Sequence, residues 1–126
     1  MSQFVDARNA DLTTRNGPGR EITVTAAAVR NGAALNAGSR YIFYVISGVC
    51  CRRDGGNNVT ADILTDMRYE AGTYFYFQAG RRDTTTALGG DRYVSLLRAD
   101  AGTPTVVRVC QTDDSAAVMA APPAWS

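Results

Sequence analysis

Apolar and polar residues alternate along much of this chain with the two-residue period of β-strands. The alternation is strict over residues 21–26, where it places Ile22 and Val24 on one face. Residues 92–98 and 105–111 follow the same period, with apolar side chains on both faces. No convincing helical period extends over ten residues. The pattern therefore predicts an all-β protein.

Two segments are apolar on both faces and so differ from a half-buried strand. In residues 40–47, Tyr41, Phe43 and Val45 oppose Ile42, Tyr44 and Ile46. This predicts a central strand that is covered on both sides, or covered on one side by an oligomer partner. Four consecutive aromatic residues occupy 74–77. For that strand we expect core packing on one face and subunit contact on the other, the alternative being a sugar-stacking face.

Turn signals separate these segments. Asn31-Gly32 and the run at residues 54–58 are turns, and residues 59–64 are a short predicted strand. Residues 48–53 either extend the preceding strand or form the next one. About seven to eight strands with turns every 8–12 residues predict an antiparallel β-sandwich or jelly roll. The expected core contains Ile22, Val24, Phe43 or Ile42, Tyr93 or Val94, and Val107 or Val109.

The pattern divides the chain into an N-terminal arm (1–19), a β-sandwich domain (20–111) and a C-terminal tail (112–126). Isolated apolar residues in the two irregular arms lack periodic neighbours, and Pro122-Pro123 favours an extended tail. We expect both arms to dock on neighbouring subunits. The predicted partner-binding residues are Phe4, Val5, Leu12, Met119 and Trp125.

The amino-acid composition excludes several kinds of catalytic and metal site. Among the 126 residues, 13 basic and 12 acidic side chains give a net charge of +1, and Lys and His are absent. This excludes lysine Schiff bases, histidine bases and zinc sites with a His ligand. The balanced charge argues against nucleic acid or an anionic membrane as partner. We expect no enzyme activity, no catalytic residues, no metal and no cofactor.

Cysteines occur at positions 50, 51 and 110. Their odd number, and the lack of an apolar stretch in residues 1–11, argue against a secreted disulfide scaffold. We expect reduced thiols that serve packing, a Cys51–Cys110 bridge being the alternative. Neighbouring side chains in a strand point to opposite faces, so one thiol of the 50–51 pair should lie in the core and the other be exposed or interfacial.

Two polar clusters have a plain structural interpretation. Residues 54–62 are rich in oxygen donors, but they fit no calcium-loop template and are expected to form a solvated hairpin loop. The pairs Arg52-Arg53 and Arg81-Arg82 each stand beside an Asp, which favours local ion pairing. Most Asp residues occupy turn positions, where capping explains them without catalysis.

The order of these segments resembles a family of small tail-phage virion structural proteins. The resemblance covers Glu21 to Gln111: an alternating strand, an Ala-Gly turn, an Arg-Tyr-apolar strand, Cys, a Gly-Gly-Asn-Asn-Val-Thr-Ala loop, a second Ala-Gly turn and an aromatic strand. It implies a capsid decoration or cement protein located in the virion. The implied partners are the major capsid protein and further copies of the chain.

The alternative is a carbohydrate- or receptor-binding β module of a phage fibre or neck. The position of the exposed aromatic residues distinguishes the two. Aromatics that cluster with Asp or Asn at loop ends favour a binding module, whereas aromatics that lie flat on strands and arms favour an interface.

Overall fold

The structure is a computed structural model that describes residues 15–80, 91–113 and 119–126. All regular elements in these residues are β-strands, and no helix occurs among them. The strands are β1 (Arg15–Val24), β2 (Val29–Arg30), β3 (Arg40–Ser47), β4 (Val49–Gly55), β5 (Met67–Glu70), β6 (Tyr74–Gln78), β7 (Tyr93–Arg98) and β8 (Thr105–Asp113). The predicted all-β fold is confirmed.

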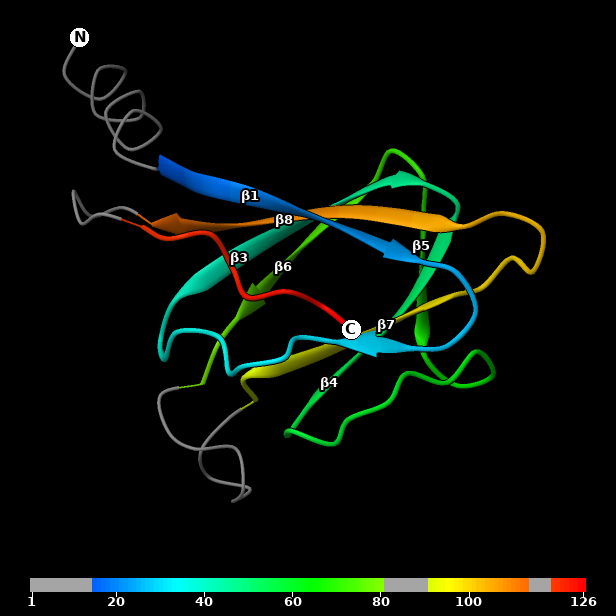
Figure 1. Ribbon diagram of the computed structural model, residues 1–126, viewed down its shortest axis with the longest axis horizontal. Coiled ribbons are helices and arrows are strands. Elements are labelled where there is room, and N and C mark those ends of the chain that lie inside the picture. The colour runs from blue at the N-terminus through cyan, green and yellow to red at the C-terminus, as the bar shows by residue number, and fades with distance from the viewer. Residues whose placement is uncertain (1–14, 81–90, 114–118) are drawn as a thin grey trace, which may run out of the picture.

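The strands form two antiparallel four-stranded sheets, as expected for a β-sandwich. The β3 sheet has the order β1-β8-β3-β6, and the β4 sheet has the order β2-β7-β4-β5. In Figure 1, β1 and β8 run side by side across the upper part of the view, with β2 and β7 below them. The chain passes between the sheets repeatedly, so the core is built from segments that are distant in sequence.

The core lies between the sheets and consists of the inward residues of the alternating strands. On β3, Phe43 is fully buried and stacks on Phe75 of β6, its register partner, with ring centroids 4.9 Å apart. Such a pair adds about 0.5–1.5 kcal/mol to the burial of the rings. The expected core residues are confirmed as Ile22, Val24, Phe43, Val94, Val107 and Val109, each at most 3% exposed.

Gly48 carries the chain from β3 in one sheet to β4 in the other. Its φ is +75°, a backbone conformation that side chains disfavour. A Cβ at this position would lie 2.8 Å from the carbonyl oxygen of Pro104 and 2.9 Å from Oγ1 of Thr105. This crossing therefore requires glycine both for its dihedral angle and for its space.

The strand predicted over residues 59–64 is wrong. Residues 59–62 have no regular structure, residues 63–65 form a turn, and β5 begins later, at Met67. The side chain of Asp62 accepts a hydrogen bond from the backbone N–H of Leu64, while Asp66 accepts one from the N–H of Asp62. Carboxylates that bind nearby backbone groups compete with a strand ladder, and here they outweigh the β-branched residues of the segment.

The domain boundaries also differ from the expected 20–111. Strand β1 begins at Arg15 and pairs with β8 as far as Asp113. The register shifts between Asn16 and Gly19, an irregularity that surrounds Pro18. Because proline has no N–H to donate, a bulge on an edge strand accommodates it without breaking the sheet.

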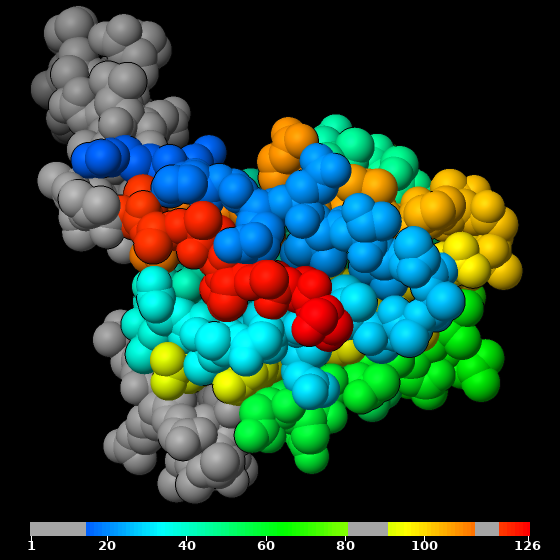
Figure 2. Space-filling model, in the orientation of Figure 1, coloured from blue at the N-terminus to red at the C-terminus, as the bar shows by residue number. Residues whose placement is uncertain are grey.

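Residues 119–126, the last described part of the C-terminal tail, pack on the domain; from here on, the tail means these residues alone. Figure 2 shows it on the surface, in red, between the blue of β1 and the cyan residues that follow β2. The indole ring of Trp125 packs against the core and meets Phe43 edge-on, with ring centroids 5.8 Å apart. In this single chain the segment thus lies on its own domain, and docking of the tail on a neighbouring subunit stays a prediction. The lone Trp has no periodic neighbours because its partners belong to other strands.

Candidate functional site

The outward face of the β3 sheet carries exposed aromatic and aliphatic side chains. We call it the tyrosine face. The exposed fractions are 43% for Tyr44, 58% for Tyr74 and 55% for Tyr76, and Ile46 is 37% exposed. A sheet that faces water on one side ordinarily carries polar residues there. Folding of a single chain leaves these apolar side chains in water, so it does not account for the composition of the tyrosine face.

Sequence alternation and strand register together assemble this face. Phe75 and Phe77 point inward from β6, which turns Tyr74 and Tyr76 outward. In the antiparallel pairing, Tyr44 lies opposite Tyr74 and Ile42 lies opposite Tyr76. The rings of Tyr74 and Tyr76 are perpendicular, with centroids 6.0 Å apart. The face is thus a set of cross-strand pairs on a rigid sheet.

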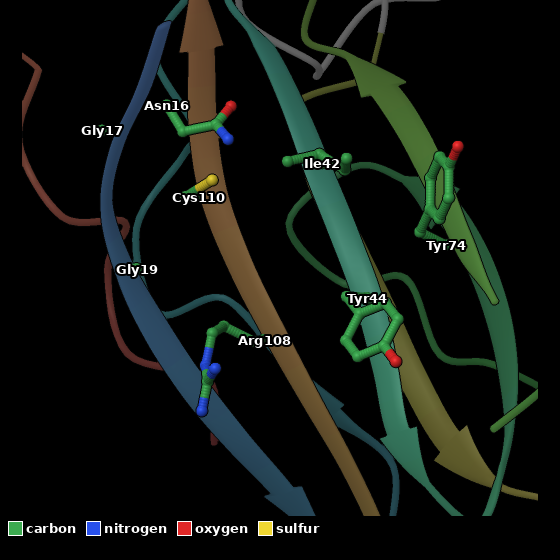
Figure 3. A pocket seen from close by; sticks show the side chains of 8 residues that line it. All are labelled: Asn16, Gly17, Gly19, Ile42, Tyr44, Tyr74, Arg108 and Cys110. Carbon is green, nitrogen blue, oxygen red and sulfur yellow. The ribbon is translucent and has the colours of Figure 1, made fainter. Parts of the chain in front are cut away.

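A groove of about 370 Å³ opens on this face (Figure 3). It crosses all four strands of the β3 sheet, and tyrosines from β3 and β6 stand on one side of it. On the β1 side, Gly17 and Gly19 line the groove, and neither has a side chain that could fill it. The lining residues are Asn16, Gly17, Gly19, Ile42, Tyr44, Tyr74, Arg108 and Cys110.

The polar groups of the groove are few. The guanidinium of Arg108 forms an exposed ion pair with Glu21 on β1, with 3.1 Å between Nη2 and Oε2. The thiol of Cys110 lies opposite Ile42 and is partly buried, and this burial raises its pKa. A raised thiol pKa lowers the thiolate fraction, so Cys110 is a poor nucleophile.

The lining of the groove is suited to binding. The chain has no histidine, and the described residues that line the groove include no carboxylate. Tyrosine rings offer flat apolar area with a hydroxyl at the edge, which suits contact with a protein surface or stacking on a sugar. Nothing among the described lining residues supplies a paired acid and base.

A second apolar cluster lies on the connection between β4 and β5 and at the first residue of β5. Leu64 is 87% exposed, Met67 is 68% exposed, and Ile63 is close to them in sequence. No aromatic residue occurs between positions 61 and 67. This cluster provides a matched surface against which the role of the tyrosine face can be measured.

Of the arginine pair at 52–53, only Arg52 forms the local ion pair expected from the sequence. Arg52 points into the sandwich, where its Nε and Nη2 donate to the carboxylate of Asp54 at 2.8 and 2.6 Å. Its guanidinium lies 4.4 Å from the ring centroid of Phe75. Arg53 pairs instead with Asp66, at 3.0 Å. Arg81 and Arg82 lie outside the described residues.

The three cysteines are free thiols, as expected. Cys50 is buried in the core, and burial is the main cause that raises its pKa to about 12. The expectation that Cys51 is exposed or interfacial is wrong, because it is also fully buried. The loop after β4 returns over that face, where the backbone N–H of Ala61 donates to Ser95 at 2.8 Å.

The structure places the predicted partner-binding residues as follows. Phe4, Val5 and Leu12 lie outside the described residues. Met119 lies beside Gly17 of β1, and Trp125 packs on the core of its own chain. Their binding to a partner stays a prediction, and Gly17, beside which Met119 lies, lines the groove of the tyrosine face.

Two further features are absent from residues 15–80, 91–113 and 119–126. Within these ranges, no three acidic or thiol side chains come close enough together to hold a metal ion. A helix long and apolar enough to cross a bilayer is likewise absent from them.

No protein-family model matches the chain, and no curated protein matches it. A de novo designed double-stranded β-helix is 17% identical, with a TM-score of 0.49 over 75% of this chain and 97% of that one. A protein from Thermus thermophilus is 12% identical, with a TM-score of 0.48 over 88% and 84% of the two chains. A candidate mannose-6-phosphate isomerase from Ralstonia eutropha is 15% identical, with a TM-score of 0.46 over 79% and 84%.

Proposed function

We propose that this chain is a non-enzymatic structural protein of a virus particle that docks on the major capsid shell through its tyrosine face. The observation that carries the proposal is the position of the exposed aromatics. Tyr44 and Tyr76 lie within β3 and β6, and Tyr74, the first residue of β6, stands opposite Tyr44, so the three form one patch on adjacent strands. Aromatics in that position favour an interface over a small-ligand site.

The physical chemistry of the face supports this role. Strand β3 is an interior strand of its sheet, yet only its inward side is covered by the second sheet. Covering Tyr44 and Ile46 with a partner removes apolar area from water at about 25 cal/mol per Å². Tyrosine is also enriched among the residues that dominate binding energy in interfaces. Because the side chains stand on a sheet, docking does not have to order the backbone, and the remaining cost is that of fixing their rotamers.

The resemblance of residues 21–111 to tail-phage structural proteins supplies the kind of particle. A capsid shell repeats one surface many times, so a small protein that contacts several subunits gains strength through multivalency. A chain of 126 residues with net charge +1 has little long-range electrostatic steering. Short-range apolar contacts are then the main source of its affinity.

A carbohydrate ligand is the second candidate, and the groove is the observation that favours it. Tyr44 and Tyr74 flank the groove, and Asn16 and Arg108 supply polar groups within it. Tyr76 does not line the groove, which separates the two functions experimentally. Tyr76→Ser should weaken docking on a shell and leave sugar binding in the groove unchanged.

The test is to find where the chain resides. Virus particles purified from cells that express it from its native locus should contain it in many copies per particle. A particle map should place its β3 sheet against the shell. Recovery of the chain only from the soluble fraction, with none in purified particles, would reject the proposal.

A further inference from the structure

The tail is held by backbone contacts of the kind that bind an added strand. The outer edge of β2 pairs with the tail. The backbone N–H of Arg30 donates to the carbonyl of Ser126 at 3.0 Å, and the N–H of Ser126 donates to the carbonyl of Arg30 at 2.9 Å. Gly32 N–H donates to the carbonyl of Ala124 at 2.8 Å. β2 is an edge strand, so the tail extends the β4 sheet as an extra short strand.

One side chain anchors this short strand. The indole N–H of Trp125 donates to the carbonyl of Val94 at 2.9 Å, while the ring packs edge-on against Phe43. These two residues belong to different sheets, so the indole closes the gap between the layers. Nearer β1, the Nε of Arg20 donates to the carbonyl of Pro122 at 2.6 Å. Pro122 and Pro123 restrict the backbone and reduce the entropy lost on docking.

These contacts have the composition of a peptide complex. An extended segment gains affinity from main-chain hydrogen bonds, and one aromatic side chain in a pocket supplies specificity. All contacts just described join the tail to residues 20–94, and none joins it to the end of β8. The acceptor surface would accordingly receive the same peptide from another chain with identical contacts.

We propose that the surface between β1 and β2 is a peptide-binding site, and that copies of this chain exchange tails through it. The occupant is the tail of a second copy, since the bound sequence is carried by every copy. Exchange replaces each contact by an identical one. The equilibrium between the closed monomer and the exchanged form is therefore set by the protein concentration and by the residues that connect the tail to β8. A repeating assembly raises the local concentration of tails and favours the exchanged form.

Disulfide trapping tests the exchange directly. Gly32 and Ala124 are exposed and paired, so a Gly32→Cys, Ala124→Cys chain should form the bridge within one molecule. One chain carrying only Gly32→Cys is then mixed with another carrying only Ala124→Cys. We expect a covalent heterodimer, identified by mass spectrometry of the linked peptides. Adding Trp125→Ala to the Ala124→Cys chain should lower its yield by roughly tenfold or more, as for loss of an interface anchor.

The result that would overturn the proposal is a double variant that closes within one chain while the mixture yields no 32–124 linkage at any concentration. A second measurement does not depend on cysteine variants. A labelled, end-blocked peptide with the sequence of residues 119–126 is titrated against the full-length Trp125→Ala chain, with its fold checked by circular dichroism. The peptide should bind this chain more tightly than the unmodified chain, in which the tail competes. Equal affinity for both chains, or binding to neither, would contradict a site that the tail occupies.

Discussion

Tyr44 of β3 stands directly opposite Tyr74 of β6, and both side chains are exposed to solvent, by 43% and 58%. The adjacent residues in sequence, Phe43 and Phe75, point inward and stack on each other in the core. Two adjacent strands thus carry aromatic pairs on both faces, although only one face meets the second sheet. This asymmetry is the physical basis of the proposed docking surface.

Gly48 should be far less tolerant of a side chain than Gly72. Both have positive φ, but a Cβ at Gly48 meets the carbonyl of Pro104 at 2.8 Å, whereas a Cβ at Gly72 meets nothing within 4 Å. Gly72→Ala should cost about 1–2 kcal/mol from its dihedral angle alone. Gly48→Ala should cost measurably more in urea unfolding. Equal losses for the two variants would show that the crossing has room to adjust.

Stability should decline as the pH rises from about 9 to about 12, in part because of Cys50. Burial raises the pKa of this thiol from 9.0 to about 12. The folded state therefore holds the proton more tightly than the unfolded state, so the stabilisation is complete below pH 9 and is lost as pH approaches 12. The free energy of unfolding should fall less between about pH 8 and about pH 10.5 in the Cys50→Ala variant than in the unmodified chain. An unchanged difference in that variant would contradict the role of Cys50.

Trp125→Ala should destabilise the domain by about 2 kcal/mol, less than the 3–5 kcal/mol of a fully buried aromatic because the ring is half-buried. Trp125→Phe keeps a ring beside Phe43 but loses the hydrogen bond to the carbonyl of Val94. The stability of Trp125→Phe should lie between those of the unmodified chain and Trp125→Ala, about 1 kcal/mol below the unmodified chain. Thermal unfolding of the three chains provides the comparison. If Trp125→Ala melts like the unmodified chain, the tail contributes nothing to the fold.

The alternation of apolar residues was sufficient to predict the sandwich and its core, because period-two patterning decides which side chains face inward. The two-faced apolar pattern of residues 40–47 also predicted a central strand, and it allowed for cover by a partner. The position of Trp125 could not be predicted. Its contacts with Phe43 and Val94 span long sequence separations, and no local pattern encodes them.

The groove and the burial of Cys51 escaped prediction for a related reason. The groove depends on Gly19 of β1 lying near Arg108 of β8, which follows from register and not from composition. Cys51 lies close to Asp62, Asp66 and Arg68, which belong to the β4–β5 connection and to β5. In both cases the sequence determines the strand but not what packs against it.

The most direct test of the proposed docking surface is the occupancy of purified chain on particles that lack it. A Tyr44→Ser, Tyr74→Ser, Tyr76→Ser chain is compared with a Leu64→Ser, Met67→Ser chain, whose changes lie on the other exposed apolar cluster. Circular dichroism establishes that both chains remain folded. The account predicts that the tyrosine variant loses occupancy by roughly tenfold or more, while the control decorates particles like the unmodified chain. Equal occupancy for the tyrosine variant and the unmodified chain would contradict docking through this face.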